Sequence, residues 1–141
     1  MGLDTYASRI AVNFFDPDLD VDSVDEDFGC TEEDLAALRA AEEECERWDG
    51  TCLFSENYLR GKIYTHLVRH ITGRSLNEIW IPPEVMREMS EAFERCDPAE
   101  AIRTYRESTS LARDLDERTV RQLRLFFRIC AERGLGLVGS W

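Results

Sequence analysis

LDERTVRQLRLFFRICAER, residues 115–133, is the longest run of the chain that keeps a helical period, and we expect it to decide the fold. Asp116 suits the N-cap of this helix, and Gly134 directly after the run is typical of a helix end. The main apolar face consists of Val120, Leu123, Phe127, Cys130 and Ala131. Leu125 and Ile129 lie nearly opposite that face, so the helix is apolar on two sides. We therefore expect the central helix of a bundle, or a helix that contacts a second subunit.

The negative charge of the chain is concentrated in its first third. Residues 1–49 hold sixteen acidic residues and three arginines, whereas residues 50–141 hold thirteen acidic and fourteen basic residues. Phosphate repels such an acidic surface, so we expect no direct binding to nucleic acid or to an anionic membrane. No run approaches the roughly 18 apolar residues of a membrane helix, and the N-terminus lacks the pattern of a secretory signal. We therefore expect a cytoplasmic protein.

Helix-start and helix-stop signals divide the preceding chain into further helices. Thr31 followed by Asp34 is a capping pattern, and Gly73 is an expected helix end. The pairs Pro82-Pro83 and Asp97-Pro98 place proline in a first helical turn, where it is tolerated. These signals predict helices over residues 31–48, 60–72, 83–96 and 98–107, with a short helical turn over residues 75–80.

The two ends of the chain predict a small strand component. Residues 6–14 are rich in β-branched and aromatic side chains, residues 51–54 fit a short strand, and the apolar tail 134–141 can pair with the N-terminal strand. Residues 16–29 form an acidic loop or arm. The expected fold is mainly α (α+β), a single-domain bundle of about five or six helices with two or three strands from the termini and residues 51–54.

Two motifs match ligand-binding patterns without their structural context. Residues 134–139, GLGLVG, match the dinucleotide fingerprint, but that motif needs a strand before it and a helix after it, and here a helix precedes it. The aspartates between Asp16 and Asp27 loosely match a calcium loop, but Val21 stands where the loop requires glycine. We expect no cofactor, and we read the aspartates as a solvated loop.

His66 and His70, the only histidines of the chain, stand four residues apart on one predicted helix. That spacing can place two imidazoles on one metal ion. Zinc proteases carry glutamate directly after the first histidine, whereas this chain has Leu67, and no third ligand is evident. A solvent-facing or half-buried pair is the simpler interpretation, and a metal site is the alternative.

Basic residues form two candidate binding sites. Arg121, Arg124 and Arg128 share a third face of the last helix, where guanidinium groups would pair with the chain's own carboxylates or bind an anion or an acidic partner. Arg60 and Lys62 stand at a helix start, where backbone N–H groups and Lys62 can hold an anion. A solvated first turn is the simpler interpretation of the second site.

Three short segments resemble a group of small uncharacterised bacterial proteins. These segments are GLDTY at residues 2–6, LRGKIY at residues 59–64 and WIPPE at residues 80–84, which fit the patterns G-L-D-x-Y, F/L-R-G-K-x-Y and W-I-P-P-E. The resemblance implies no activity. It directs attention to Tyr6, Arg60, Lys62, Tyr64 and Trp80.

Three functional hypotheses follow. The favoured one is a non-enzymatic cytoplasmic binding or regulatory protein, which binds another protein or forms a homodimer through Leu125 and Ile129. The second is a small-molecule or metal-dependent enzyme that uses the helix carrying His66 and His70. The third is an acidic decoy that occupies a nucleic-acid-binding protein with residues 16–27 as phosphate mimics.

Overall fold

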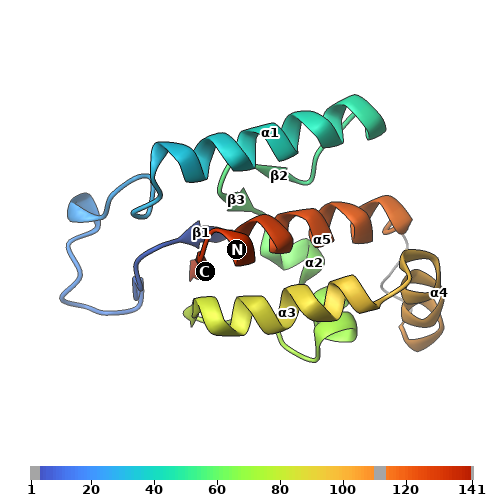
Figure 1. Ribbon diagram of the computed structural model, residues 1–141. Coiled ribbons are helices and arrows are strands. Elements are labelled where there is room, and N and C mark those ends of the chain that lie inside the picture. Colours follow the sequence, from blue (N-terminus) through green and yellow to red (C-terminus); the bar gives the residue numbers. More distant parts are fainter. Residues whose placement is uncertain (1–3, 110–113, 141) are drawn as a thin grey trace.

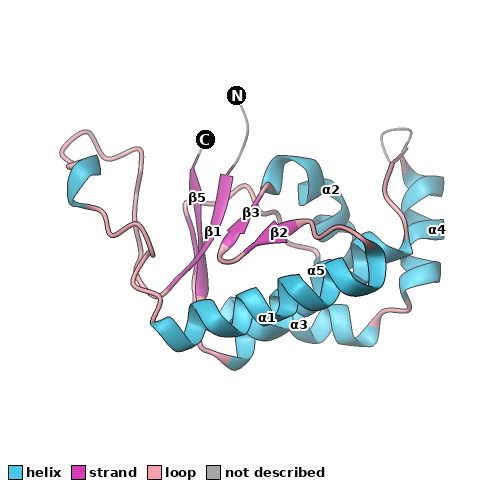
Figure 2. Ribbon diagram, turned by 90° about the horizontal axis from the view of Figure 1, so that it is seen from above, coloured by secondary structure: helices cyan, strands magenta, loops and turns pink. Residues whose placement is uncertain are grey.

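The computed structural model describes residues 4–109 and 114–140. Three helices, α1 (Glu32–Asp49), α5 (Glu117–Glu132) and α3 (Pro83–Arg95), lie side by side with α5 in the middle (Figure 1). They form one layer in front of the β-sheet, as the view from above shows (Figure 2). The helix α2 (Gly61–Thr72) lies behind this layer, and α4 (Pro98–Ser108) closes one end.

The sheet is antiparallel, with the order β2-β3-β1-β5-β4 among the described residues. Its two centre strands, β1 (Asp4–Ser8) and β5 (Gly136–Ser140), come from the two ends of the chain and pair along their full length. The expected pairing of the tail with the N-terminal strand is therefore confirmed. The flanking strands have two residues each: β2 (Phe54–Ser55), β3 (Tyr58–Leu59) and β4 (Trp80–Ile81).

The predicted α+β class is correct, but the predicted bundle with two or three strands is wrong in detail. The helices pack as a layer on a five-stranded sheet, the first strand ends at Ser8 rather than Phe14, and residues 79–81 contain a strand instead of continuing a helical turn. A strand of two residues shows no period in the sequence, because it is defined by the neighbour with which it pairs.

The predicted helix ends are largely confirmed by their cap geometry. Thr31 and Asp34 form a capping box at the start of α1, and Asp116 with Thr119 forms another at the start of α5. Gly73 ends α2 in the left-handed conformation. Local hydrogen bonds within a few residues of the chain set these boundaries, and the sequence displays them directly.

The helix α5 is the central helix, as its two apolar faces predicted. Phe126 and Phe127 are fully buried, whereas Leu125 and Ile129 are half-buried beside the main core. Burial of each large apolar side chain contributes roughly 1.5–3 kcal/mol before entropy is subtracted. The packing of α5 between α1 and α3 thus accounts for its pattern. No helix among the described residues is long and apolar enough to cross a membrane.

The segment between β1 and α1, residues 9–30, contains the acidic arm and packs against the outer face of the sheet. Its regular structure is one 3₁₀ turn, Val21–Ser23. Phe28 stacks on Tyr6 of β1 with ring centroids 4.5 Å apart, and Val12 and Phe28 are buried against Val138 of β5. Apolar anchors therefore hold the arm to the domain although its aspartates face water.

Candidate binding surface

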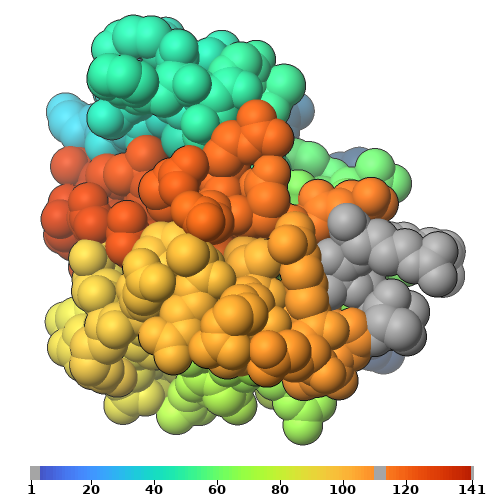
Figure 3. Space-filling view, turned by 90° about the vertical axis from the view of Figure 1, so that its right-hand side faces the viewer, coloured from blue at the N-terminus to red at the C-terminus, as the bar shows by residue number. Residues whose placement is uncertain are grey.

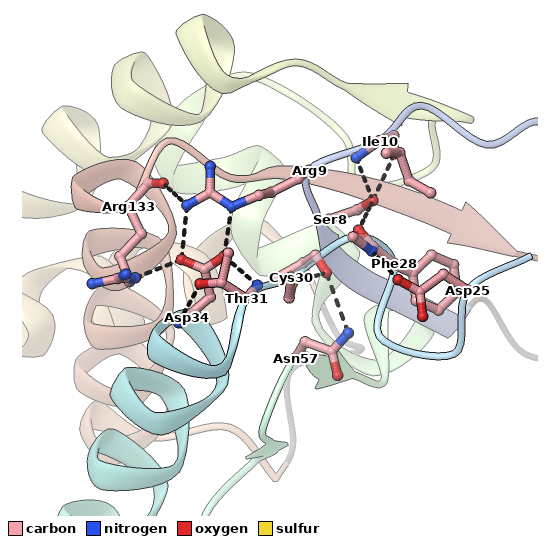
Figure 4. Close-up of polar contacts among 12 residues, drawn as sticks. Ser8, Arg9, Ile10, Asp25, Phe28, Cys30, Thr31, Asp34, Asn57 and Arg133 are labelled. Atoms are coloured by element: carbon pink, nitrogen blue, oxygen red, sulfur yellow. Dashed lines mark hydrogen bonds and ion pairs between the residues drawn. The ribbon is translucent and has the colours of Figure 1, made fainter.

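A buried carboxylate, Asp34, joins three segments of the chain (Figure 4). Arg9 contacts both of its oxygens, at 2.6 and 2.8 Å, and Arg133 contacts Oδ1 at 2.6 Å. The Thr31 N–H donates to Asp34 Oδ2 at 2.9 Å, and Arg9 also donates to the Arg133 carbonyl at 2.9 Å. Asp34 therefore links the end of β1, the start of α1 and the end of α5. We call Arg9, Thr31, Asp34 and Arg133 the Asp34 cluster.

The Asp34 cluster is a structural site. Burial acts to raise the pKa of Asp34, but the hydrogen bonds from Arg9, from the Thr31 N–H and from Arg133 outweigh it and hold that pKa far below its ordinary value. A carboxylate that is fully ionised and saturated with donors exchanges no proton near neutral pH. Its chemistry is to hold the chain together.

Gln122 of α5 fixes the turn that follows α1. Its buried side chain accepts from the Leu53 N–H at 2.9 Å and donates to Asp49 Oδ2 at 2.9 Å and to the Thr51 carbonyl at 3.0 Å. The oxygen and the nitrogen of one buried amide therefore both bond to the end of α1 and the loop that follows it. This arrangement positions the last turn of α1 against the first half of α5.

Trp48, in that last turn of α1, is 76% exposed. Beside it lies a hollow of about 350 Å³ between α1 and α5, in which Leu125 supplies apolar surface and Glu44 and Arg121 supply opposite charges. Figure 3 shows the end of α1 lying directly against α5 on this side of the molecule. Tryptophan and arginine are enriched at the centres of protein interfaces. The Trp48 surface is lined by Glu44, Cys45, Trp48, Asp49, Arg121, Gln122 and Leu125.

The predicted arginine stripe is divided among different roles. Arg128 forms a two-point ion pair with Glu94 of α3, at 2.6 and 3.0 Å, which holds the pKa of Glu94 below its ordinary value. Arg121 contacts Glu117 at 3.5 Å on its own helix. Arg124 is half-buried and forms no ion pair with a described residue. Carboxylates of the chain therefore hold two of the three arginines, and Arg121 also reaches the Trp48 surface.

The two histidines point to no metal site among the described residues. No group of three or more His, Cys, Asp or Glu side chains in residues 4–109 and 114–140 lies close enough to hold a metal ion. His66 is exposed, and the Nε2 of His70 lies 2.8 Å from Thr104 Oγ1. The same hydroxyl lies 3.0 Å from the Glu100 carbonyl and 3.1 Å from the Ala101 carbonyl, so it is held between α2 and its own helix, α4.

The remaining predicted residues lie in separate places. Arg60 is the N-cap residue of α2 and makes no capping bond with its side chain, and Lys62 is exposed in the first turn. Tyr64 lines a hollow beside Cys52 and Gln122, whereas His70 lines another hollow against α4. Tyr64 and His70 therefore do not face a common cavity.

Trp48 and Gln122 were not singled out in the sequence. Trp48 follows Cys45 by three residues, so the helical period alone leaves it at the border of the core stripe. Gln122 is one helical turn before Phe126, and a polar residue at an apolar position is a signal that would have found it.

Comparisons with protein-family models, with curated proteins and with solved structures found no match for this chain. The geometry of its own residues therefore carries the functional argument.

Proposed function

We propose that this chain is a non-enzymatic cytoplasmic binding protein that acts through the Trp48 surface, and that the partner is a second copy of the chain. The observation that carries the proposal is the exposure of Trp48, 76%, beside a hollow on the same surface. An indole left in water forgoes roughly 1.5–3 kcal/mol that burial would contribute. A partner that covers Trp48 would recover that free energy.

The shape of the Trp48 surface favours a second copy. A two-fold interface places the same patch of both subunits face to face, so each patch must carry both a projection and a recess. Trp48 is a projection, and the hollow beside Leu125 is a recess. Trp48 of each copy can therefore enter the hollow of the other.

The charges of the Trp48 surface favour the same arrangement. Glu44 and Arg121 line the hollow from α1 and α5 respectively. A two-fold axis between the copies brings Glu44 of each toward Arg121 of the other. Because the chain carries a net charge of −12, two copies repel each other in general, and complementary charges at the contact help to offset that repulsion.

The test is the mass of the protein in solution, measured by sedimentation over a range of concentrations. We expect the natural sequence to form a dimer and Trp48→Ala to remain a monomer with an unchanged circular dichroism spectrum. Val21→Ala is the matched control, because Val21 is an exposed apolar residue of the 3₁₀ turn Val21–Ser23, 63% accessible, and it does not line the Trp48 surface. A natural sequence that stays monomeric at every concentration would overturn the proposal.

Charge reversal tests the two-fold arrangement itself. We expect Arg121→Glu to weaken the dimer, and we expect Glu44→Arg combined with Arg121→Glu to restore it, since both contacts are then reversed together. Leu125→Asp should also abolish the dimer, but Leu125 packs against the core, so its fold must be checked first. Failure of the double reversal to restore association would reject the Glu44–Arg121 contact.

A further inference from the structure

Among the described residues, no strand pairs with the outer edge of β4. β4 stands last in the strand order, and Trp80 lies opposite Val138 of β5. The Gly139 N–H donates to the Ile79 carbonyl at 3.2 Å, which makes Ile79 a hydrogen-bonded position. Backbone groups alternate in direction along an antiparallel strand, so the Trp80 N–H and C=O point away from β5. They are available to a segment that lies beside the strand.

A hollow of about 560 Å³ adjoins this edge. Arg69 and Arg74 line it together with Glu78. Arg69 is exposed and forms no ion pair with any residue that the structure describes. Arg74 donates one hydrogen bond to Glu88 at 3.1 Å, which leaves most of its five N–H groups for a ligand. Glu88 therefore offsets Arg74, and Arg69 is the cation at this edge that pairs with no carboxylate of the described residues.

The apolar part of the lining completes a binding strip. Trp80, Pro82 and Val85 line the same hollow, and the indole of Trp80 lies against Gly136, where an added Cβ would collide with it. Glycine at position 136 therefore leaves room for the indole beside β5. The strip thus offers a strand edge, guanidinium groups and apolar surface side by side.

We propose that the hollow at the β4 edge binds an extended peptide segment that carries carboxylate side chains. The peptide lies beside Trp80, accepts from its N–H and donates to its C=O, as an added strand does. Side chains of an extended segment alternate between two faces, so carboxylates on one face reach Arg69 and Arg74 while apolar side chains on the other contact Pro82 and Val85. This site is independent of the Trp48 surface.

A peptide fits this geometry better than a small anion does. Exposed ion pairs contribute little in water, so two surface arginines hold a free carboxylate weakly. The strand edge adds directed hydrogen bonds that only a peptide backbone can use. The edge is also short and is followed by Pro82, which prevents a long strand from being added and so limits edge-to-edge aggregation.

The experiment uses the full chain and two synthetic probes, acetyl-(Glu-Val)₃-amide and acetyl-(Lys-Val)₃-amide, with binding measured by calorimetry. We expect the glutamate peptide to bind and the lysine peptide to bind at least about tenfold more weakly. Arg69→Glu should weaken the binding of the glutamate peptide by a similar factor. Arg103→Glu is the matched control, because Arg103 is an exposed arginine on α4 that pairs with Glu107.

N-methylation of the peptide tests the strand-edge contact. We expect methylation of one alternating set of amides to abolish binding and methylation of the other set to be tolerated, because only one set faces Trp80. The proposal would be overturned if both methylated peptides bind as well as the unmethylated one, or if neither binds. It would also be overturned if neither unmethylated probe binds. Repeating the titration with Trp48→Ala separates the two surfaces, because that variant should bind the peptide unchanged.

Discussion

The helices α1 and α5 run antiparallel, and the two ends of this pair differ in how their polar and apolar groups are accommodated. At one end Asp34 of α1 contacts Arg133, just after α5, and is fully buried. At the other end Asp49 of α1 contacts Gln122 of α5, and the neighbouring Trp48 is mostly exposed. At the first end both oxygens of the carboxylate accept hydrogen bonds, whereas the second end leaves a large apolar side chain in water.

Under the proposed function, the first end of this helix pair serves folding and the second end serves binding. The Asp34 cluster joins the two chain ends to α1, so its loss affects the whole fold. Trp48 is 76% exposed, so we expect it to contribute little to the stability of the monomer. Substitutions at the two ends should therefore change different measured quantities.

The largest effect is expected for Asp34→Ala. Removal of one partner from a buried charge network costs about 3–5 kcal/mol, and because Arg9 and Arg133 are about one-third exposed we expect the lower end of that range. Urea denaturation measures this free energy of unfolding. The exposed pair of Arg39 with Glu32 supplies the control, since Arg39→Ala should cost under about 1 kcal/mol. Equal losses from both variants would contradict the structural role of Asp34.

At the end of the helix pair that carries Trp48, Gln122→Ala should lower the free energy of unfolding by about 2–3 kcal/mol. The substitution removes the partner of the Leu53 N–H and of the Thr51 carbonyl, and an unsatisfied buried polar group costs about 1–3 kcal/mol. Chemical denaturation measures the loss. A loss under about 0.5 kcal/mol would mean that water replaces the amide and that the turn after α1 is held by other contacts.

The sequence predicts the features that depend on residues close together in the chain and misses those that depend on distant residues. The starts of α1 and α5 and the end of α2 follow from capping bonds within three residues, so Thr31, Asp116 and Gly73 mark them correctly. Strands β3 and β4 depend on pairing with β1 and β5, partners more than fifty residues away, and two residues carry no period of their own.

The candidate site was predicted only in part for the same reason. Arg121 and Leu125 were recognised because α5 displays them at helical spacing. Trp48 lies more than seventy residues earlier, and its exposure depends on where α5 packs against α1. The depressed pKa of Asp34 is likewise invisible locally, because its partners Arg9 and Arg133 lie 25 and 99 residues away.

The stability that the Asp34 cluster contributes should also depend on pH. The pKa of Asp34 is lowered in the folded state, so its contribution is complete above the unfolded pKa of about 3.9 and is lost as the pH falls below it. In that window the unfolded chain takes up a proton that the folded chain does not, at about 1.4 kcal/mol for each pH unit until the folded pKa is reached. Asp34→Asn cannot titrate, so its free energy of unfolding should fall less steeply between pH 4 and pH 3. Parallel curves for the two proteins would place the acid sensitivity elsewhere.

The smallest effect on folding is expected for Trp48→Ala, although its effect on association is the largest. In a dilute solution where the chain is monomeric, the substitution removes contacts mainly with water, so the free energy of unfolding should change by less than about 0.5 kcal/mol. At a concentration where the natural sequence is dimeric, the same substitution should lower the apparent stability of the protein. The reason is that only the folded chain forms the dimer, so dimerisation stabilises the folded state. The difference between the two concentrations should vanish in Trp48→Ala. A loss of about 2 kcal/mol already in the monomer would instead place Trp48 in the core, and the contrast between the two ends of α1 would no longer separate folding from binding.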